Sequence, residues 1–196
     1  MDHSLTDDTT QNRHSGNHVM VQRYDRVTVA FHWLTAGLVL VLFLIAQGWG
    51  FLDRADRAPL KLTHTSLGVV LAALILARIV WRLFFGNRLV AANTGLPSTV
   101  ARLGHFLLYV LIVLQVGLGF LIGWSGRNAA INAFGFQIPS PLSAFTRDEH
   151  NFFEETHNLL AWSIIALVAV HASAALFHHY VLRDGLLWRM RFGRGV

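Results

Sequence analysis

Histidine is the residue type in this sequence best suited to chemistry, and two of its 11 histidines share one long apolar stretch. His157 and His171 are fourteen residues apart. In an α-helix that spacing brings both side chains to nearly the same face, about 21 Å apart along the axis. Imidazole is a common ligand of iron and other transition metals. Two stacked histidines therefore predict two cofactor sites, for which two b-type haems with bis-imidazole ligation are the usual case.

These histidines could also serve without haem, as polar structural groups or as zinc ligands. A histidine within a membrane helix can be an interior polar group bonded to a hydroxyl or a carbonyl, although ionisable groups inside a bilayer more often mark functional sites. A structural zinc site takes four close ligands, which this spacing does not supply. The choice depends on whether other helices place histidines at the same two depths.

The elements that must position these histidines are four apolar segments, each long enough to cross a bilayer as a helix. The chain is 54% hydrophobic and only 14% charged, which favours an integral membrane protein. It contains no cysteine, so a covalently attached haem, an iron–sulfur cluster and disulfides are excluded. We predict an all-α four-helix bundle over residues 23–196, preceded by a disordered tail over 1–22. The predicted helices cover about 27–49, 60–85, 100–124 and 156–183, with a long loop over 125–149.

The distribution of basic residues predicts the orientation of the bundle. Eleven of the 16 basic residues fall on the side of the two termini and five on the other side. Basic residues concentrate in cytoplasmic loops, so both termini are predicted to be cytoplasmic. The net charge of +5 does not indicate nucleic-acid binding, because the basic residues stand at the ends of apolar runs.

In this orientation the histidines fall at two depths. His64 near the start of the second helix and His157 near the start of the fourth both lie towards the outer face. His32 in the first helix and His171 in the fourth lie towards the inner face. His105 in the third helix is a further inner candidate, so the inner pair is less determined than the outer one.

Other residues are consistent with cofactor sites at these two depths. Arg78 follows His64 by fourteen residues, so it shares that helix face at the depth of the inner site. There it could pair with haem propionates, or its side chain could extend to the membrane surface. Gly117, Gly119 and Gly123 leave room for a flat macrocycle beside the third helix, or the GxxxG spacing of Gly119 and Gly123 allows close helix packing.

Several stretches in this order resemble the bacterial cytochrome b561 family, in particular its small four-helix members that oxidise superoxide. They are RYDRVTVAFHW, DRADRAPLKLTHTSLG, LGHFLLYVLIVLQVGLG, FGFQIP, ETHNLLAW and HASAALFHHYVLRDGLLWRM, and the resemblance covers about residues 23–192. It implies a multi-pass protein of the bacterial inner membrane that binds two haem b groups per chain. It assigns His32 and His171 to the inner haem iron and His64 and His157 to the outer haem iron, which disfavours His105.

The resemblance also implies that superoxide is oxidised at the outer face and that ubiquinone is reduced in the membrane. Outer basic side chains could steer the superoxide anion, although most such residues are ordinary interfacial ones. The steering candidates are Lys61, Arg54, Arg57 and Arg127. The alternative function is a cytochrome b subunit that links a dehydrogenase or hydrogenase partner to the quinone pool. The short outer loops favour a protein that works without such a partner.

A quinone site is predicted at the inner end. His178 follows His171 by seven residues and so shares its face one to two turns further in. Its imidazole could bond a quinone carbonyl and relay a proton. Trp33, next to His32, could form an apolar wall of that site or belong to the interfacial aromatic belt. The expected partners are thus ubiquinone, superoxide and membrane lipid.

Overall fold

The computed structural model describes residues 23–53, 55–86, 96–126 and 129–191, so the predicted disordered tail lies outside the described residues. Within these residues the chain forms four long helices and one two-stranded hairpin. All four helices are long and apolar enough to cross a membrane, and the predicted all-α membrane bundle is confirmed. The elements are α1 Arg26–Gly48, η1 Trp49–Phe51, α2 Arg57–Phe84, α3 Leu96–Trp124, β1 Ala130–Ala133, β2 Phe136–Pro139, α4 Arg147–Phe177, η2 His178–Leu182 and η3 Leu186–Met190.

Local capping explains where the helices begin. The Asp25 carboxylate accepts the Thr28 N–H at 2.8 Å and caps α1. The helix α4 begins nine residues earlier than the sequence predicted, because Thr146 and Glu149 form a reciprocal capping box. A polar sequence can extend a membrane helix in this way once its first N–H groups have partners. The added turns carry α4 beyond its apolar stretch.

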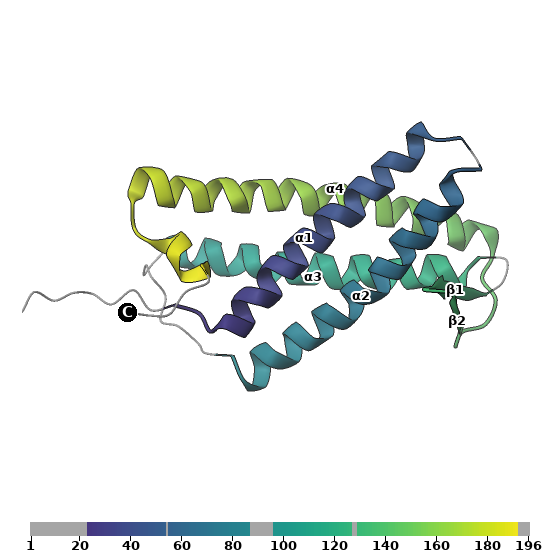
Figure 1. Cartoon of the computed structure of the whole chain (residues 1–196), viewed down its shortest axis with the longest axis horizontal. Helices are drawn as coiled ribbons and strands as arrows, with labels where there is room; N and C mark the ends of the chain where they lie inside the picture. Colours follow the sequence, from purple (N-terminus) through teal and green to yellow (C-terminus); the bar gives the residue numbers. More distant parts are fainter. Residues whose placement is uncertain (1–22, 54, 87–95, 127–128, 192–196) are drawn as a thin grey trace, which may run out of the picture.

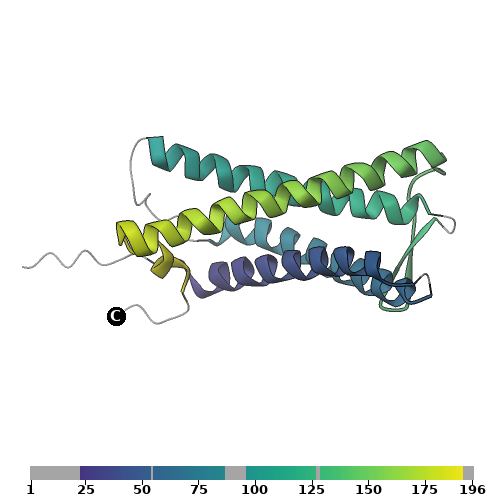
Figure 2. The ribbon, with the colours of Figure 1, turned by 90° about the horizontal axis from the view of Figure 1, so that it is seen from above.

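The four helices form two crossed layers. The helix α1 packs on α2, and α3 packs on α4. Figure 1 shows the two pairs crossing, and Figure 2 shows them as separate layers seen from above. Leu42, Leu71 and Ile75 form a buried apolar cluster in the bundle.

A β-hairpin occupies part of the segment that was predicted to be a loop. Its strands pair with Ile131 opposite Ile138, and its turn, Phe134–Gly135, has φ values of 51° and 82° at the two residues, as a tight hairpin turn requires. The Phe134 N–H donates to the buried Ser66 hydroxyl of α2 at 2.9 Å. A Cβ at Gly123 of α3 would lie 2.5 Å from Ile131 Cγ1, so this close approach requires glycine.

The hairpin thus joins α2 and α3 at one end of the bundle, which we call the hairpin end (Figure 1). The opposite end, where α1 begins and α4 finishes, is the terminal end. There α4 passes into the single π-turn η2, and the chain reverses through Arg183 and Gly185 in left-handed conformations. The following 3-10 turn, η3, packs back against α4.

The outer faces of the helices are apolar. Large hydrophobic side chains stay exposed along the whole bundle, among them Leu34, Leu44, Leu76, Leu114 and Val170. In water such a surface would be strongly unfavourable, whereas lipid chains cover it without loss of hydrogen bonds. The surface is that of a multi-pass membrane protein.

Candidate functional site

Two histidine pairs connect the two layers of the bundle. His64 of α2 faces His157 of α4, and their ring centroids are 6.4 Å apart. His32 of α1 faces His171 of α4 with the same separation of 6.4 Å. The structure therefore brings together both pairs that the sequence analysis placed at matching depths. One pair lies at the hairpin end and the other at the terminal end.

The separation within each pair suits a metal between the rings. Two metal–nitrogen bonds of about 2 Å each, plus two ring radii slightly over 1 Å, place opposed imidazole centroids roughly 6 Å apart. Both pairs match this distance. His105 lies closer to His171, with its ring centroid at 5.2 Å, which is too short for a metal in line between the two. The side chain of His105 is also exposed.

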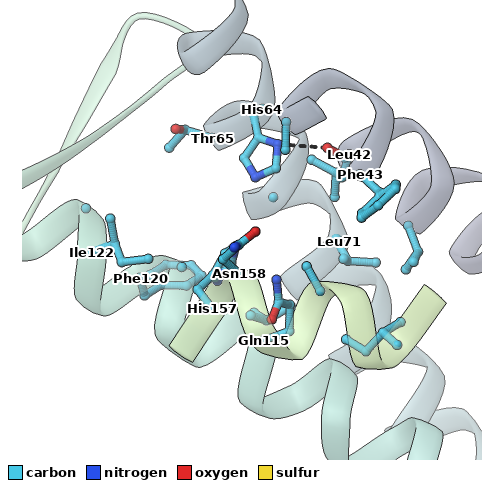
Figure 3. Close-up of a pocket in the computed structure, with 18 of the residues that line it drawn as sticks. Leu42, Phe43, His64, Thr65, Leu71, Gln115, Phe120, Ile122, His157 and Asn158 are labelled. Atoms are coloured by element: carbon cyan, nitrogen blue, oxygen red, sulfur yellow. Dashed lines mark hydrogen bonds between the residues drawn. The ribbon is translucent and has the colours of Figure 1, made fainter. Parts of the chain in front are cut away.

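The hairpin-end pair faces a cavity of about 450 Å³, within the range typical of cofactor sites. Figure 3 shows His64 and His157 on opposite sides of this hollow, with Gln115 and Phe120 along its lower edge. The wall is largely apolar, and the hairpin contributes Ile131 to it. Its size and lining fit a flat, mostly hydrophobic group held between two imidazoles.

The nitrogen atoms of the hairpin-end pair support the same conclusion. His64 Nδ1 lies 3.1 Å from the Leu42 carbonyl oxygen. A carbonyl only accepts, so Nδ1 carries the proton and Nε2 is free to bind a metal, as in most metal-ligating histidines. The described part of the chain gives His157 Nδ1 no hydrogen-bond partner, although that atom is buried. Gly119 lies against the same ring, and a Cβ there would stand 3.5 Å from His157 Cε1.

The donor set distinguishes haem from a zinc site. Among the described residues, no three His, Asp or Glu side chains come together as a metal-binding group. Structural zinc needs four protein ligands. A haem iron needs only two, because the porphyrin supplies the other four nitrogens. The two isolated histidine pairs fit haem.

The terminal-end pair has a cation beside it. The half-buried Arg78 guanidinium lies over the Tyr109 ring of α3, 5.0 Å from its centroid. Within the described residues, Arg78 forms no salt bridge with a carboxylate. A guanidinium in a membrane-spanning segment without such a partner suits an anionic group of a bound cofactor. The role of Arg78 as a partner of a haem propionate, predicted from the sequence, stays a prediction that these surroundings allow.

A second cavity, of about 440 Å³, lies at the terminal end. The Trp33 Nε1–H donates to the Met190 carbonyl at 3.0 Å, which holds the indole against η3. The Trp188 ring carries the Arg191 guanidinium 4.6 Å above its centroid. The wall is aromatic and cationic, and it is formed by Trp33, His179, Leu187, Trp188, Met190 and Arg191.

The quinone candidates predicted from sequence have different surroundings. Trp33 lines the terminal-end cavity, whereas His178 is hydrogen-bonded through Nδ1 to the Asp184 carboxylate. Partial burial of Asp184 opposes its ionisation, but the bonds from His178 and the Leu186 N–H outweigh it and hold the pKa of Asp184 below its usual value. His179, which the sequence analysis did not select, lines the cavity instead. The π-turn rotates the register after His178, and helical spacing alone could not reveal that.

The basic candidates at the hairpin end differ in position. Lys61 is exposed and lines the cavity, with Nζ 5.9 Å from the centroid of the Trp49 ring. The Arg57 Nε–H donates to the Leu52 carbonyl at 2.8 Å, so that side chain fixes the α1–α2 connection. Arg54 and Arg127 lie outside the described residues. Trp49 was missed by the sequence analysis, because no helical spacing links it to His64 across the connection.

Comparison with known proteins agrees with this arrangement. A family model described as prokaryotic cytochrome b561 matches residues 23–193. The chain belongs to the prokaryotic cytochrome b561 family. It is accordingly a haem b-binding membrane protein of electron transport, located in the bacterial inner membrane.

Individual relatives align over most of this b561-family chain. A Yersinia pestis protein named "Probable superoxide oxidase CybB" is 30% identical over 172 residues, covering 87% of this chain and 97% of the relative. The Escherichia coli protein "Cytochrome b561 homolog 2" is 32% identical over 182 residues, covering 86% and 91%. A Cereibacter sphaeroides protein named "Cytochrome b562" is 30% identical over 173 residues, covering 85% and 94%.

Proposed function

We propose that this b561-family protein is a dihaem superoxide:ubiquinone oxidoreductase. It takes electrons from superoxide at the hairpin end and delivers them to ubiquinone at the terminal end. The observation that carries the proposal is the pair of equal histidine–histidine separations, 6.4 Å each, at the two ends of one helix. A single histidine pair would explain cofactor binding at one place. Two pairs along α4 would also provide a path for electrons from one end of the bundle to the other.

In this proposal His64 and His157 would hold one haem b, and His32 and His171 would hold the other. Haem held by two imidazoles would supply a one-electron centre that does not readily bind O₂. The protein fixes the His64 ring through Leu42 and leaves space beside Gly119. Arg78 would pair with a propionate at the terminal end.

The hairpin end suits a small anionic donor. Superoxide loses one electron to become O₂, and no bond breaks and no proton moves, so the site needs neither a nucleophile nor a general base. The exposed Lys61 ammonium attracts the anion to the cavity, with Arg54, Arg57 and Arg127 as further candidates. The name of the Yersinia pestis relative supports superoxide as the donor.

The terminal end suits ubiquinone. Its reduction takes two electrons and two protons, so two superoxide anions are consumed per quinone. The aromatic cavity offers Trp33 and Trp188 as flat walls and His179 as a hydrogen-bond donor to a quinone carbonyl. The bonded pair His178 and Asp184 lies in the same segment and can pass protons from the adjacent aqueous phase. The excess of basic residues at this end supports its placement in the cytoplasm.

Stopped-flow spectroscopy of the detergent-purified protein tests the proposal. Superoxide should reduce the haems at a rate near the diffusion limit, and a soluble ubiquinone analogue should reoxidise them. A His157→Ala variant serves as the matched control, because it lacks the hairpin-end centre. Haems that are present but inert to superoxide would overturn the proposal and favour a cytochrome b subunit that serves a dehydrogenase or hydrogenase.

A further inference from the structure

Each histidine pair has a tryptophan at the edge of one of its rings. Trp49 meets His64 with ring centroids 5.2 Å apart and planes at 66°. Trp33 meets His32 with centroids 5.3 Å apart and planes at 76°. The two contacts are nearly the same, although they lie at opposite ends of the bundle. In both cases the tryptophan belongs to the α1–α2 layer. It contacts the histidine of that same layer, whose ring faces α4.

Each of these tryptophans also lines the cavity at its own end. Trp49 belongs to the wall of the hairpin-end cavity, together with Lys61. Trp33 belongs to the wall of the terminal-end cavity. Trp49 therefore contacts both the exposed Lys61 side chain and His64. Trp33 contacts His32 and lines the terminal-end cavity. The proposed function makes both of these histidines iron ligands.

We propose that Trp49 and Trp33 are electronic bridges, one for each half-reaction. Trp49 couples superoxide to the hairpin-end centre through His64, and Trp33 couples the terminal-end centre to ubiquinone through His32. This inference rests on the proposed function and adds the residues through which electrons enter and leave the protein. Electron transfer weakens steeply as the empty gap between donor and acceptor widens, and a packed aromatic ring replaces that gap with bonded π-density.

The charge at the hairpin end places the donor beside the bridge. The Lys61 ammonium lies 5.9 Å from the Trp49 ring centroid, a separation at which a cation and an indole attract each other. An anion held by this ammonium is therefore brought against the Trp49 ring. Glu154 of α4 contributes a carboxylate to the cavity wall, but it is engaged with His150, whose Nε2 is 3.5 Å away.

At the terminal end a hydrogen bond holds the Trp33 indole in place. The Trp33 Nε1–H donates to the Met190 carbonyl at 3.0 Å, although the side chain is 49% exposed. This bond holds the indole plane between His32 and the aromatic cavity. A quinone ring in that cavity would contact Trp33 directly, and His179 from η2 lines the same wall.

Neither tryptophan changes its own oxidation state in this scheme. Superoxide gives up one electron and leaves as O₂, and the electron is accepted by the one-electron centre at His64 and His157. At the other end ubiquinone accepts two electrons, one at a time, with two protons from the aqueous phase. The indoles mediate both transfers without gaining or losing a proton.

The competing possibility is that each tryptophan only supports its histidine sterically. At the hairpin end this support is already present, because the His64 ring is held by the Leu42 carbonyl at 3.1 Å. Removing Trp49 should therefore leave the ligand orientation intact. The electron paramagnetic resonance spectrum of the ferric protein reports that orientation independently of activity.

The test measures the two half-reactions separately in the purified holoprotein. Haem reduction by superoxide and reoxidation of the pre-reduced protein by a soluble ubiquinone analogue are recorded for Trp49→Leu and Trp33→Leu. Trp49→Phe and Trp33→Phe keep an aromatic ring at each position. Trp162→Leu is the matched control, because the Trp162 ring packs on Phe43, with centroids 4.9 Å apart. Within the described residues Trp162 lines neither cavity and makes no ring contact with the four ligand imidazoles.

We expect Trp49→Leu to slow reduction by superoxide several-fold and to leave reoxidation unchanged, and Trp33→Leu to do the reverse. The Phe variants should recover most of each rate, Trp162→Leu should alter neither, and the ferric spectra should match the wild type. Equal slowing of both half-reactions, unchanged rates in both Leu variants, or a shifted ferric spectrum would each overturn the inference. A wild-type protein that superoxide does not reduce would overturn the proposed function as well, which separates the two failures.

Discussion

The two ends of the bundle hold equivalent histidine pairs in different surroundings. Both pairs have ring centroids 6.4 Å apart and a tryptophan at the ring edge. The hairpin end is closed by a β-hairpin and offers the exposed ammonium of Lys61 at its cavity. The terminal end carries the half-buried guanidinium of Arg78 and a folded-back segment with a bonded histidine and aspartate. In the proposed function, the features that the two ends share would bind the cofactor, and the features that differ would select the substrate at each end.

This difference matches the chemistry that each end is proposed to perform. A donor that gives only an electron needs an attractive charge and a short path. An acceptor that also takes protons needs titratable groups and a route from water. The terminal end meets this second requirement, because a hydrogen-bonded imidazole and carboxylate lie in the segment beside its cavity. The comparison therefore favours the hairpin end as the side that exchanges electrons alone.

The largest effect is expected when one histidine pair is disrupted and the other is left intact. His157→Ala should lower the haem content from two per chain to one and remove the hairpin-end centre, and His171→Ala should remove the other. The loss should be complete at the altered site, because a single imidazole leaves the iron without one axial ligand. Haem quantification with potentiometric titration checks this. His105→Ala is the control and should keep both haems, whereas loss of a haem in that variant would make His105 a ligand.

The contact between the β-hairpin and α3 can be disrupted without changing a histidine of either pair. Gly123→Leu should destabilise the protein by about 1–3 kcal/mol, since the new side chain overlaps Ile131 and overpacks that contact. Thermal unfolding in detergent measures the shift in midpoint. Gly117→Leu is the control, because a Cβ there meets nothing within 4 Å. Equal midpoints for the two variants would mean that the hairpin does not depend on the close approach at Gly123.

The Arg78 guanidinium at the terminal end should raise the midpoint potential of the haem proposed there. Arg78→Gln should lower the midpoint potential of that haem by about 30–60 mV, because about 59 mV corresponds to a tenfold change in a one-electron equilibrium. A lost positive charge disfavours the more negative, reduced state. Redox titration followed optically measures the shift. Arg82→Gln, one turn away and exposed, should shift the potential less, and a larger shift there would assign the propionate to Arg82.

The smallest expected effect is on stability, from Asp184 in the segment that folds back after α4. The pKa of Asp184 is lowered in the folded protein, so its ionised form stabilises the fold above the ordinary Asp range, and this contribution is lost as the pH falls through the lowered pKa. Asp184→Asn should cost under about 1 kcal/mol at pH 7, because the residue lies at the surface, where solvent screens its charge. The thermal midpoints of variant and wild type should converge as the pH falls below the lowered pKa of Asp184. A difference between the midpoints that does not shrink as the pH is lowered would mean that the Asp184 charge is not its source.

The sequence was most informative where periodicity and membrane thickness act together. Fourteen-residue spacing on one helix face predicted that His157 and His171 would each find a partner at its own depth, and the structure brings both pairs together. Helix boundaries were less accurate. The first turns of α4 are polar, and only the capping box of Thr146 and Glu149 explains why they are helical.

Contacts between distant segments could not be predicted from spacing. The hairpin depends on a left-handed turn and on close contact with Gly123, a glycine whose predicted roles were helix packing or room for a macrocycle. Trp49 reaches His64 across the α1–α2 connection, and a π-turn brings His179, not His178, to the cavity. Each of these depends on tertiary geometry that a pattern within one element does not encode.

The placement of one histidine of each pair on α4 has a consequence for biogenesis. The ribosome releases this helix last of the four, so neither pair exists while α1, α2 and α3 are entering the bilayer. Under the proposed function, haem would be captured only after translation of the final span, and both sites would form together. A chain that stops before α4 would retain His32 and His64 but neither complete pair, so haem binding would then report that the whole bundle had been made.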